Sequence, residues 1–235
     1  LLMMHQRIGK KKKLVFFYIF VFILLSTQFN KNMIFENKFN NNQNDIQVFG
    51  LSENENFKIF TSLNSLTYEN IFLIKKNIFY NILKDNNLIE SFYVKKIYPN
   101  KIEVNIKATK ILAITNKEGK KYFIGGNGKL ILANKIHYYN KNLPYVFSKS
   151  NYDYFVNLKK IIDKSQFKYE EIDSFYYFPS NRWDIKTRDG LLIKLPETNL
   201  AESLKLAQLI KSNKKIMKKN IIDLRIKNKV ILSDE

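Results

Sequence analysis

The sequence predicts an α+β protein: one N-terminal transmembrane helix, a strand-helix-helix-strand-strand domain, and a mixed α+β domain with a mainly antiparallel sheet. Three observations predict this. Residues 14–25 are uninterruptedly apolar, as a membrane helix requires. Isoleucines recur at every fourth position through 74–82, which places them along one stripe of a helix. Apolar and polar residues alternate through 102–108, which is the period of a strand with one buried face.

The amino-acid composition limits the kinds of function that this chain can have. The 235 residues carry a net charge of +19, which favours nucleic acid, anionic lipid or acidic protein as partner. With 45% hydrophobic residues the chain is expected to fold, and its length suits an anchor plus two small domains. Cysteine is absent, which excludes disulfides, a thiolate nucleophile and cysteine-based metal sites.

The N-terminal segment is interpreted as a membrane anchor. Residues 1–13 form a basic cytoplasmic tail, and residues 14–29 a transmembrane helix of about 24 Å, short for a hydrocarbon core of about 30 Å. Flanking lysines can extend its reach, and their position predicts that the bulk of the chain crosses into the periplasm. A cleaved signal peptide is the alternative, although no small-residue cleavage site follows. Either interpretation argues against nucleic acid as the partner.

The first domain is expected over 45–115, after a polar linker at 30–44. A short strand ends at Gly50, and Ser52 with Glu55 has the capping-box spacing of a helix start. A helical stripe and a second helix are expected next, followed by strands over 91–98 and 102–108. The first stripe consists of Phe57, Ile59, Phe60, Leu63 and Leu66, and the second of Ile74, Ile78, Phe79, Ile82 and Leu83.

The second domain is expected over 116–235. Glycines at 125–128 separate two short strands and predict a hairpin turn; they lack the pattern of a phosphate-binding loop. Apolar periodicity predicts helices over 155–162 and 200–210. Further strands are expected at 172–178, 182–187 and 191–195, and a last strand at 221–232.

The last strand, 221–232, is the candidate interaction site. Ile222, Leu224 and Ile226 are expected on one face, and Asp223 and Arg225 on the other. If this strand is a sheet edge, its unpaired backbone groups can accept a partner strand.

No arrangement typical of catalysis or of a cofactor or metal site is found. His5 and His137 are predicted on opposite sides of the membrane, which excludes a shared metal site. Glu170 and Glu171 are adjacent and are expected to be solvated. The lysine cluster at 211–219 is read as a solvated loop, with anionic lipid or cell-wall polymer as the alternative. A binding protein is therefore predicted, not an enzyme.

Four stretches carry a resemblance: the strand ending at Gly50, residues 89–102, residues 182–195 and Asp223-Leu224-Arg225. They resemble conserved runs of the FtsQ/DivIB family of bacterial cell-division proteins, which carry a POTRA domain followed by a β domain. The strand ending at Gly50 resembles the family's "V.G", and residues 89–102, IESFYVKKIYPNKI, resemble its "I..A.V.R.YP..L.I" run. Residues 182–195 resemble its tryptophan-bearing hairpin, and Asp223-Leu224-Arg225 its C-terminal "DLR". The resemblance covers about residues 45–232, with lysines at 95 and 96 where arginine is usual.

The resemblance implies a single-pass inner-membrane scaffold at the division septum. It implies that the chain links early and late division proteins in the divisome. It further implies that the chain binds FtsB- and FtsL-like proteins by strand addition and thereby controls septal peptidoglycan synthesis. The implied partner contacts are Arg182, Asp223, Leu224, Arg225 and Ile226. The alternatives are an anchored periplasmic cell-wall enzyme, another POTRA-bearing assembly factor and a cytoplasmic nucleic-acid binder.

Overall fold

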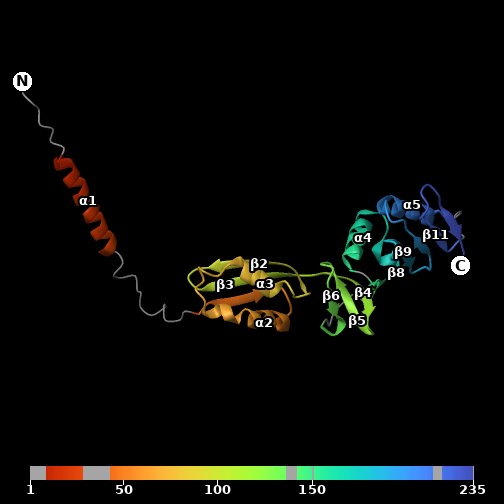
Figure 1. Ribbon diagram of the computed structural model, residues 1–235, viewed down its shortest axis with the longest axis horizontal. Coiled ribbons are helices and arrows are strands. Elements are labelled where there is room, and N and C mark those ends of the chain that lie inside the picture. Colours follow the sequence, from red (N-terminus) through yellow and green to blue (C-terminus); the bar gives the residue numbers. More distant parts are fainter. Residues whose placement is uncertain (1–8, 29–42, 136–141, 150, 214–218, 235) are drawn as a thin grey trace, which may run out of the picture.

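The computed structural model describes residues 9–28, 43–135, 142–149, 151–213 and 219–234. An N-terminal helix is followed by two sheet-containing units along the long axis of the molecule (Figure 1). Residues 1–8 of the predicted tail, 30–42 of the predicted linker, His137 and the lysines at 214, 215 and 218 lie outside the described residues.

Helix α1 covers Gly9–Gln28 and leaves its large apolar side chains exposed from Leu14 to Leu25, apart from Val21, which is partly covered. A helix is therefore present where 14–29 predicted one, with its start shifted to Gly9. None of the helices in the described ranges combines the length and the apolar character needed to cross a membrane. The apolar run is only twelve residues long, and lysines fill positions 10–13 ahead of it.

The first unit is a three-stranded sheet with helices on one face, in the order β1-β3-β2 (Figure 1). Strand β3 pairs in parallel with β1 and antiparallel with β2. The elements are β1 (Asp45–Phe49), α2 (Glu53–Ser62), a 3-10 helix (Asn64–Tyr68), α3 (Lys76–Leu83), β2 (Ile89–Ile97) and β3 (Lys101–Ala108). The expected order of strand, helix, helix, strand, strand is confirmed.

The core of this unit confirms the alternation in β3 and corrects the stripe in α2. Ile102, Val104 and Ile106 are all buried. In α2, however, Phe57 and Phe60 are exposed and Ile59 is buried; Leu63, just after α2, and Leu66, in the 3-10 helix, are also buried. Ile59, Leu63 and Leu66 belong to the same buried cluster, whereas Phe57 and Phe60 lie on the exposed side of α2. Ser52 does precede α2, but its side chain makes no capping hydrogen bond.

The second unit is a nine-stranded sheet in the order β12-β11-β10-β9-β8-β7-β4-β5-β6. Its strands are β4 (Ile111–Lys117), β5 (Lys120–Gly125), β6 (Leu130–Leu132), β7 (Tyr145–Phe147), β8 (Ile172–Tyr177), β9 (Trp183–Thr187), β10 (Leu192–Lys194), β11 (Ile221–Asp223) and β12 (Ile231–Ser233). Strand β4 straddles the division expected at residues 115 and 116. Strands β4 and β7 were not predicted.

Two helices cross over the sheet on the same face. Helix α4 (Asp153–Lys164) links the parallel strands β7 and β8, and α5 (Leu200–Ser212) links the parallel strands β10 and β11. Parallel neighbours need such crossovers, whereas the remaining pairs are mostly antiparallel, as predicted. The core beneath the helices includes Phe155, Phe175, Trp183 and Leu204, all buried. The opposite face of the sheet carries no helix in the described part of the chain.

The last predicted strand, 221–232, is wrong as a single element. The chain leaves β11 after Asp223 and reverses, with Asn228 in the left-handed region at φ 60°. It returns as β12, antiparallel to β11. Strand β12 is therefore the edge of the sheet, and β11 is covered on both sides.

Asn127 joins the two sheets. It lies in the predicted hairpin turn, which is confirmed between β5 and β6. Its side-chain amide donates to the backbone carbonyls of Asn87 (3.1 Å) and Ile89 (2.9 Å) at the start of β2. Its backbone N–H donates to Thr109 Oγ1 (3.2 Å), between β3 and β4. Asn87 in turn donates to the carbonyl of Leu130 (2.7 Å). The glycine-rich loop therefore connects the two units through hydrogen bonds.

Candidate functional site

The open face of the large sheet carries a row of side chains that runs across six strands. Cross-strand register places them opposite one another in turn, from β7 to β12. The row consists of Phe147, Tyr176, Asp184, Lys194, Asp223 and Ile231. We call it the open-face row. It changes from aromatic at β7 and β8 to charged at β9, β10 and β11, and it ends at the apolar edge strand.

The charged part of the open-face row includes Asp223, which is in contact with Arg225 just beyond the end of β11. The Arg225 Nε atom donates to both carboxylate oxygens of Asp223, at 2.8 and 3.0 Å. The backbone N–H of Arg225 also donates to the same carboxylate at 3.0 Å. These charge-assisted contacts lower the pKa of Asp223 and raise the pKa of Arg225. The pair is partly exposed, so it holds Arg225 in one orientation more than it stabilises the fold.

The pKa of Asp184 is shifted in the opposite direction to that of Asp223. Burial against the strand raises its pKa, while Lys194, Arg225 and Arg182 act in the other direction and Asp223 adds to the rise. The carboxylate of Asp184 is therefore half-buried and lies beside three cations. The open-face row is thus suited to binding a segment with both charged and apolar side chains.

Asp184→Asn is expected to raise the free energy of unfolding at pH 7 by up to about 1 kcal/mol, allowing for solvent screening. Because the folded-state pKa of Asp184 lies above its unfolded value of 3.8, the wild-type chain is penalised at pH values above the folded-state pKa. The penalty fades as pH falls towards 3.8, where both states are protonated. Urea unfolding of the two proteins at pH 7 and pH 4 measures this. A difference that grows on acidification would contradict it.

The implied contact residues are not equivalent in the structure. Arg182, just before β9, is half-buried, and its Nε atom donates to Ser180 Oγ at 2.8 Å. Leu224 is only 5% exposed and packs in the core under α4 and α5. Ile226 is exposed beyond the end of β11 instead of sharing the face of Leu224. The structure therefore brings Arg182, Asp223 and Arg225 to one surface around Asp184, while Leu224 supports that surface from within.

Sequence reasoning missed the aromatic end of the row. Tyr145 and Phe147 stack on the open face with centroids 6.2 Å apart, and Phe147 stacks on Tyr176 at 5.0 Å. Val146 between them is fully buried. The alternation of Tyr145, Val146 and Phe147 was the available signal in the sequence. Three residues are too few to establish a strand period.

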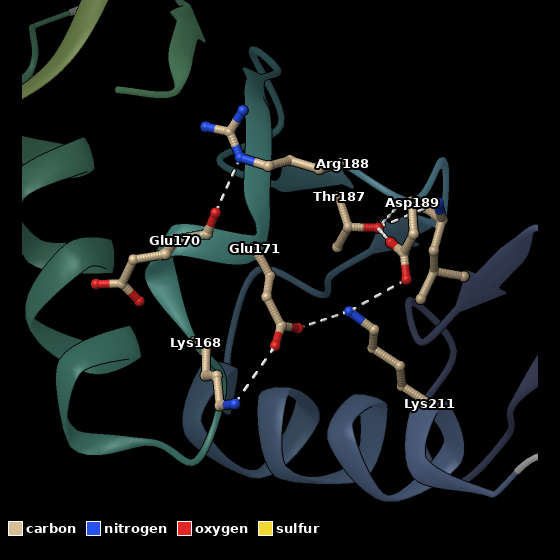
Figure 2. A network of polar contacts seen from close by, with 8 residues as sticks. Lys168, Glu170, Glu171, Thr187, Arg188, Asp189 and Lys211 are labelled. Atoms are coloured by element: carbon tan, nitrogen blue, oxygen red, sulfur yellow. Dashed lines mark hydrogen bonds and ion pairs between the residues drawn. The ribbon is translucent and has the colours of Figure 1, made fainter. Parts of the chain in front are cut away.

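A second polar network holds α5 against the sheet and is shown in Figure 2. Lys211 Nζ lies 2.7 Å from Glu171 and 3.4 Å from Asp189, which lies in the β9–β10 turn. Arg188 donates to the backbone carbonyls of Glu170 (2.9 Å) and Asn142 (2.7 Å). Glu170 is exposed, as expected, and Glu171 is partly exposed and pairs with Lys211. Lys211 belongs to this network instead of to a free basic loop. The bonds join α5 to the β9–β10 turn and to the start of β8, so we assign the network a structural role.

Candidate metal ligands do not gather within the described residues. No three histidine, aspartate or glutamate side chains there lie close enough to hold a metal ion. The described hollow at Gln43–Ile46, Phe60 and Asn100 is open and lies beside the start of β1, far from the open-face row in the sequence.

The sequence relationships fit this architecture. A family model described as "Cell division protein FtsQ/DivIB, C-terminal" matches residues 113–225, which run from β4 to the end of the Asp223–Arg225 contact. Proteins named cell division protein FtsQ from Rickettsia bellii and Rickettsia conorii are 27% and 25% identical over 173 residues. Residues 113–225 match the C-terminal domain of the FtsQ/DivIB family, and the chain is similar to cell division proteins named FtsQ.

The FtsQ/DivIB match to the Rickettsia proteins covers 73% of this chain and 64% of each relative, which is less than two thirds of their length. The extracytoplasmic domain of DivIB from Geobacillus stearothermophilus is 13% identical, with a TM-score of 0.33. That comparison covers 46% of this chain and 98% of the DivIB chain. The similarity to the family rests on the sequence matches.

Proposed function

We propose that this chain is a division-site scaffold that acts by binding, without catalysis or cofactor. The name of its FtsQ relatives supports a role in cell division. In this proposal the first unit is a POTRA domain over about 45–115. The C-terminal domain over about 116–235 recruits FtsB- and FtsL-like proteins and so controls septal peptidoglycan synthesis.

The observation that carries the binding mode is the position of β12. It is the outer strand of the nine-stranded sheet, so its outer backbone groups are available to another strand. It is only three residues long, and Ile231 is exposed at the end of the open-face row. A partner strand added to β12 would extend the row by one position, with Arg225 and Asp184 available to its charged side chains.

We also propose that α1 attaches the chain to the bacterial inner membrane, with the N-terminus cytoplasmic and the bulk periplasmic. The support is the exposed apolar surface from Leu14 to Leu25, which needs a non-aqueous environment, and the basic sequence at 10–13 before it. Lysine side chains can reach the headgroups while an apolar stretch shorter than the bilayer lies below them.

Arg225→Glu is expected to weaken binding of the source organism's FtsB-like protein about tenfold, or ~1.4 kcal/mol. The substitution places a third negative charge beside Asp223 and Asp184, so it reverses the charge that the row presents. Lys227→Glu is the matched control, because it makes the same charge change two residues further on at an exposed position. Binding is measured by titration calorimetry on full-length proteins in detergent.

The outcomes separate the parts of the proposal. Equal affinities for Arg225→Glu, Lys227→Glu and wild type would remove the open-face row as the partner site. Arg225→Gln checks whether removing the positive charge, without adding a negative one, also lowers the affinity for the FtsB-like protein. Ile231→Pro tests strand addition itself, since proline disrupts pairing at β12. Turnover of purified peptidoglycan by the wild-type chain would overturn the non-catalytic role.

A further inference from the structure

Large apolar side chains gather at the end of the first unit where the N-terminal segment joins it. The backbone N–H of Asp45 donates to the carbonyl of Asn100 at 2.7 Å, which places the β2–β3 turn beside the start of β1. The Asn44 side chain donates to the carbonyls of Leu66 and Glu69, both at 2.7 Å. At this end four side chains are each at least 55% exposed: Tyr68, Phe72, Leu73 and Tyr98. We call them the apolar tip.

The apolar tip is held rigidly. The rings of Phe72 and Tyr98 stack with centroids 4.6 Å apart and planes 13° apart. Lys96 extends under the loop and donates through Nζ to the carbonyls of Ile71 (2.6 Å) and Ile74 (2.5 Å). Ile71 and Ile74 are both buried, so the loop fixes its two ends in the core and turns Phe72 and Leu73 outward. Two adjacent exposed apolar residues on a fixed loop indicate a contact surface rather than a fraying segment.

The chemistry of the apolar tip fits a lipid headgroup region. Tyrosines present an apolar ring and a polar hydroxyl, which suits the membrane–water interface. Lys75 and Lys76 are exposed directly after the loop, while the exposed acidic residues at this end are Glu69, before the loop, and Asp45, at the start of β1. Lysines at this position can pair with anionic lipid phosphates while Phe72 and Leu73 lie deeper.

The position of the apolar tip near the N-terminal segment favours a membrane over a protein as its partner. The exposed apolar helix ends at Gln28, and the described first unit begins at Gln43. The fourteen residues between them can span at most about 50 Å, so this end of the unit stays within reach of whatever holds α1. We propose that the apolar tip seats the first unit on an anionic bilayer surface. This inference rests on the proposed membrane attachment of α1.

The absence of cysteine allows a direct test with the full-length chain. Single cysteines are introduced as Leu73→Cys, Asp85→Cys and Phe16→Cys, each labelled with a polarity-sensitive fluorophore. Position 85 follows α3 at the opposite end of the unit and is exposed, so it is the matched control. The proteins are reconstituted into phosphatidylglycerol–phosphatidylethanolamine vesicles with or without nitroxide-bearing lipids.

We expect the label at 73 to shift to shorter wavelength and to be quenched by the nitroxide lipids, while the label at 85 is not. Adding Phe72→Ser should reduce the quenching at 73, with an unchanged circular dichroism spectrum as the folding control. Quenching of the label at 16 without quenching of the label at 73 would contradict the bilayer contact of the apolar tip but not the membrane attachment of α1. Absence of quenching at 16 overturns the attachment itself. Quenching at 73 that persists in vesicles lacking phosphatidylglycerol would remove the role of Lys75 and Lys76.

Discussion

Gly50→Ala is expected to lower the free energy of unfolding by about 3 kcal/mol or more. Gly50 has φ 110°, a backbone conformation that residues with a Cβ rarely adopt. A Cβ built there would lie 1.7 Å from the carbonyl oxygen of Ile106 in β3. Because that oxygen belongs to the central strand of the first sheet, it cannot move without breaking the pairing with β1 or β2. Urea unfolding followed by circular dichroism measures the loss.

Gly119→Ala is the matched control for Gly50→Ala. Gly119 also has a positive φ, 74°, but nothing lies within 4 Å of the position of its Cβ. Only the conformational cost remains, which is about 1 kcal/mol. If the two substitutions destabilise the chain equally, the contact with Ile106 does not govern the requirement for glycine at position 50.

Phe175→Ala is expected to cost about 3–5 kcal/mol of unfolding free energy, the usual range for a large aromatic side chain removed from a core. Phe175 is fully buried under the helices of the second unit. Its ring meets Phe155 edge-on at 5.2 Å between centroids and Trp183 nearly perpendicularly at 6.3 Å. The cavity would therefore form where β8, β9 and α4 meet.

Phe147→Ala tests whether burial accounts for the effect at Phe175. Phe147 lies on the neighbouring strand but on the open face, so its loss should cost less than about 1 kcal/mol. The fluorescence of Trp183, the single tryptophan of the chain, reports unfolding of this core directly. A cost at Phe147 equal to that at Phe175 would show that the open face is covered in solution.

Periodicity predicted those elements in which one face is buried over several residues. Strand β3 and helices α4 and α5 are of this kind. Spacing found their buried residues except Val156 in α4, and it also assigned Ala108, which is exposed, to the buried face of β3. Strands β4 and β7 were missed for physical reasons. Strand β7 has only three residues, too few for a period. Strand β4 contains a register irregularity between Ile111 and Ala113, which interrupts its alternation.

The candidate site was predicted in part. Asp223 and Arg225 were expected on the same side of the last strand, and the structure shows them in direct contact. The prediction that Ile226 shares a face with Leu224 was wrong, because the apolar alternation in the sequence continues past the point where the backbone turns. Asn228, a residue that tolerates the left-handed conformation, was the local signal of that reversal. Which strand forms the edge of a sheet depends on tertiary pairing between strands, and no local sequence pattern encodes that pairing.

The hydrogen bonds of Asn127 restrict how the two sheets can move relative to each other. A twist of one sheet against the other would have to break the hydrogen bonds from Asn127 to Asn87, Ile89 and Thr109 together. These hydrogen bonds limit rotation of the unit that carries the apolar tip against the unit that carries β12. If the apolar tip contacts a bilayer and β12 binds a partner, as proposed above, the fold would set the distance between that bilayer and the partner.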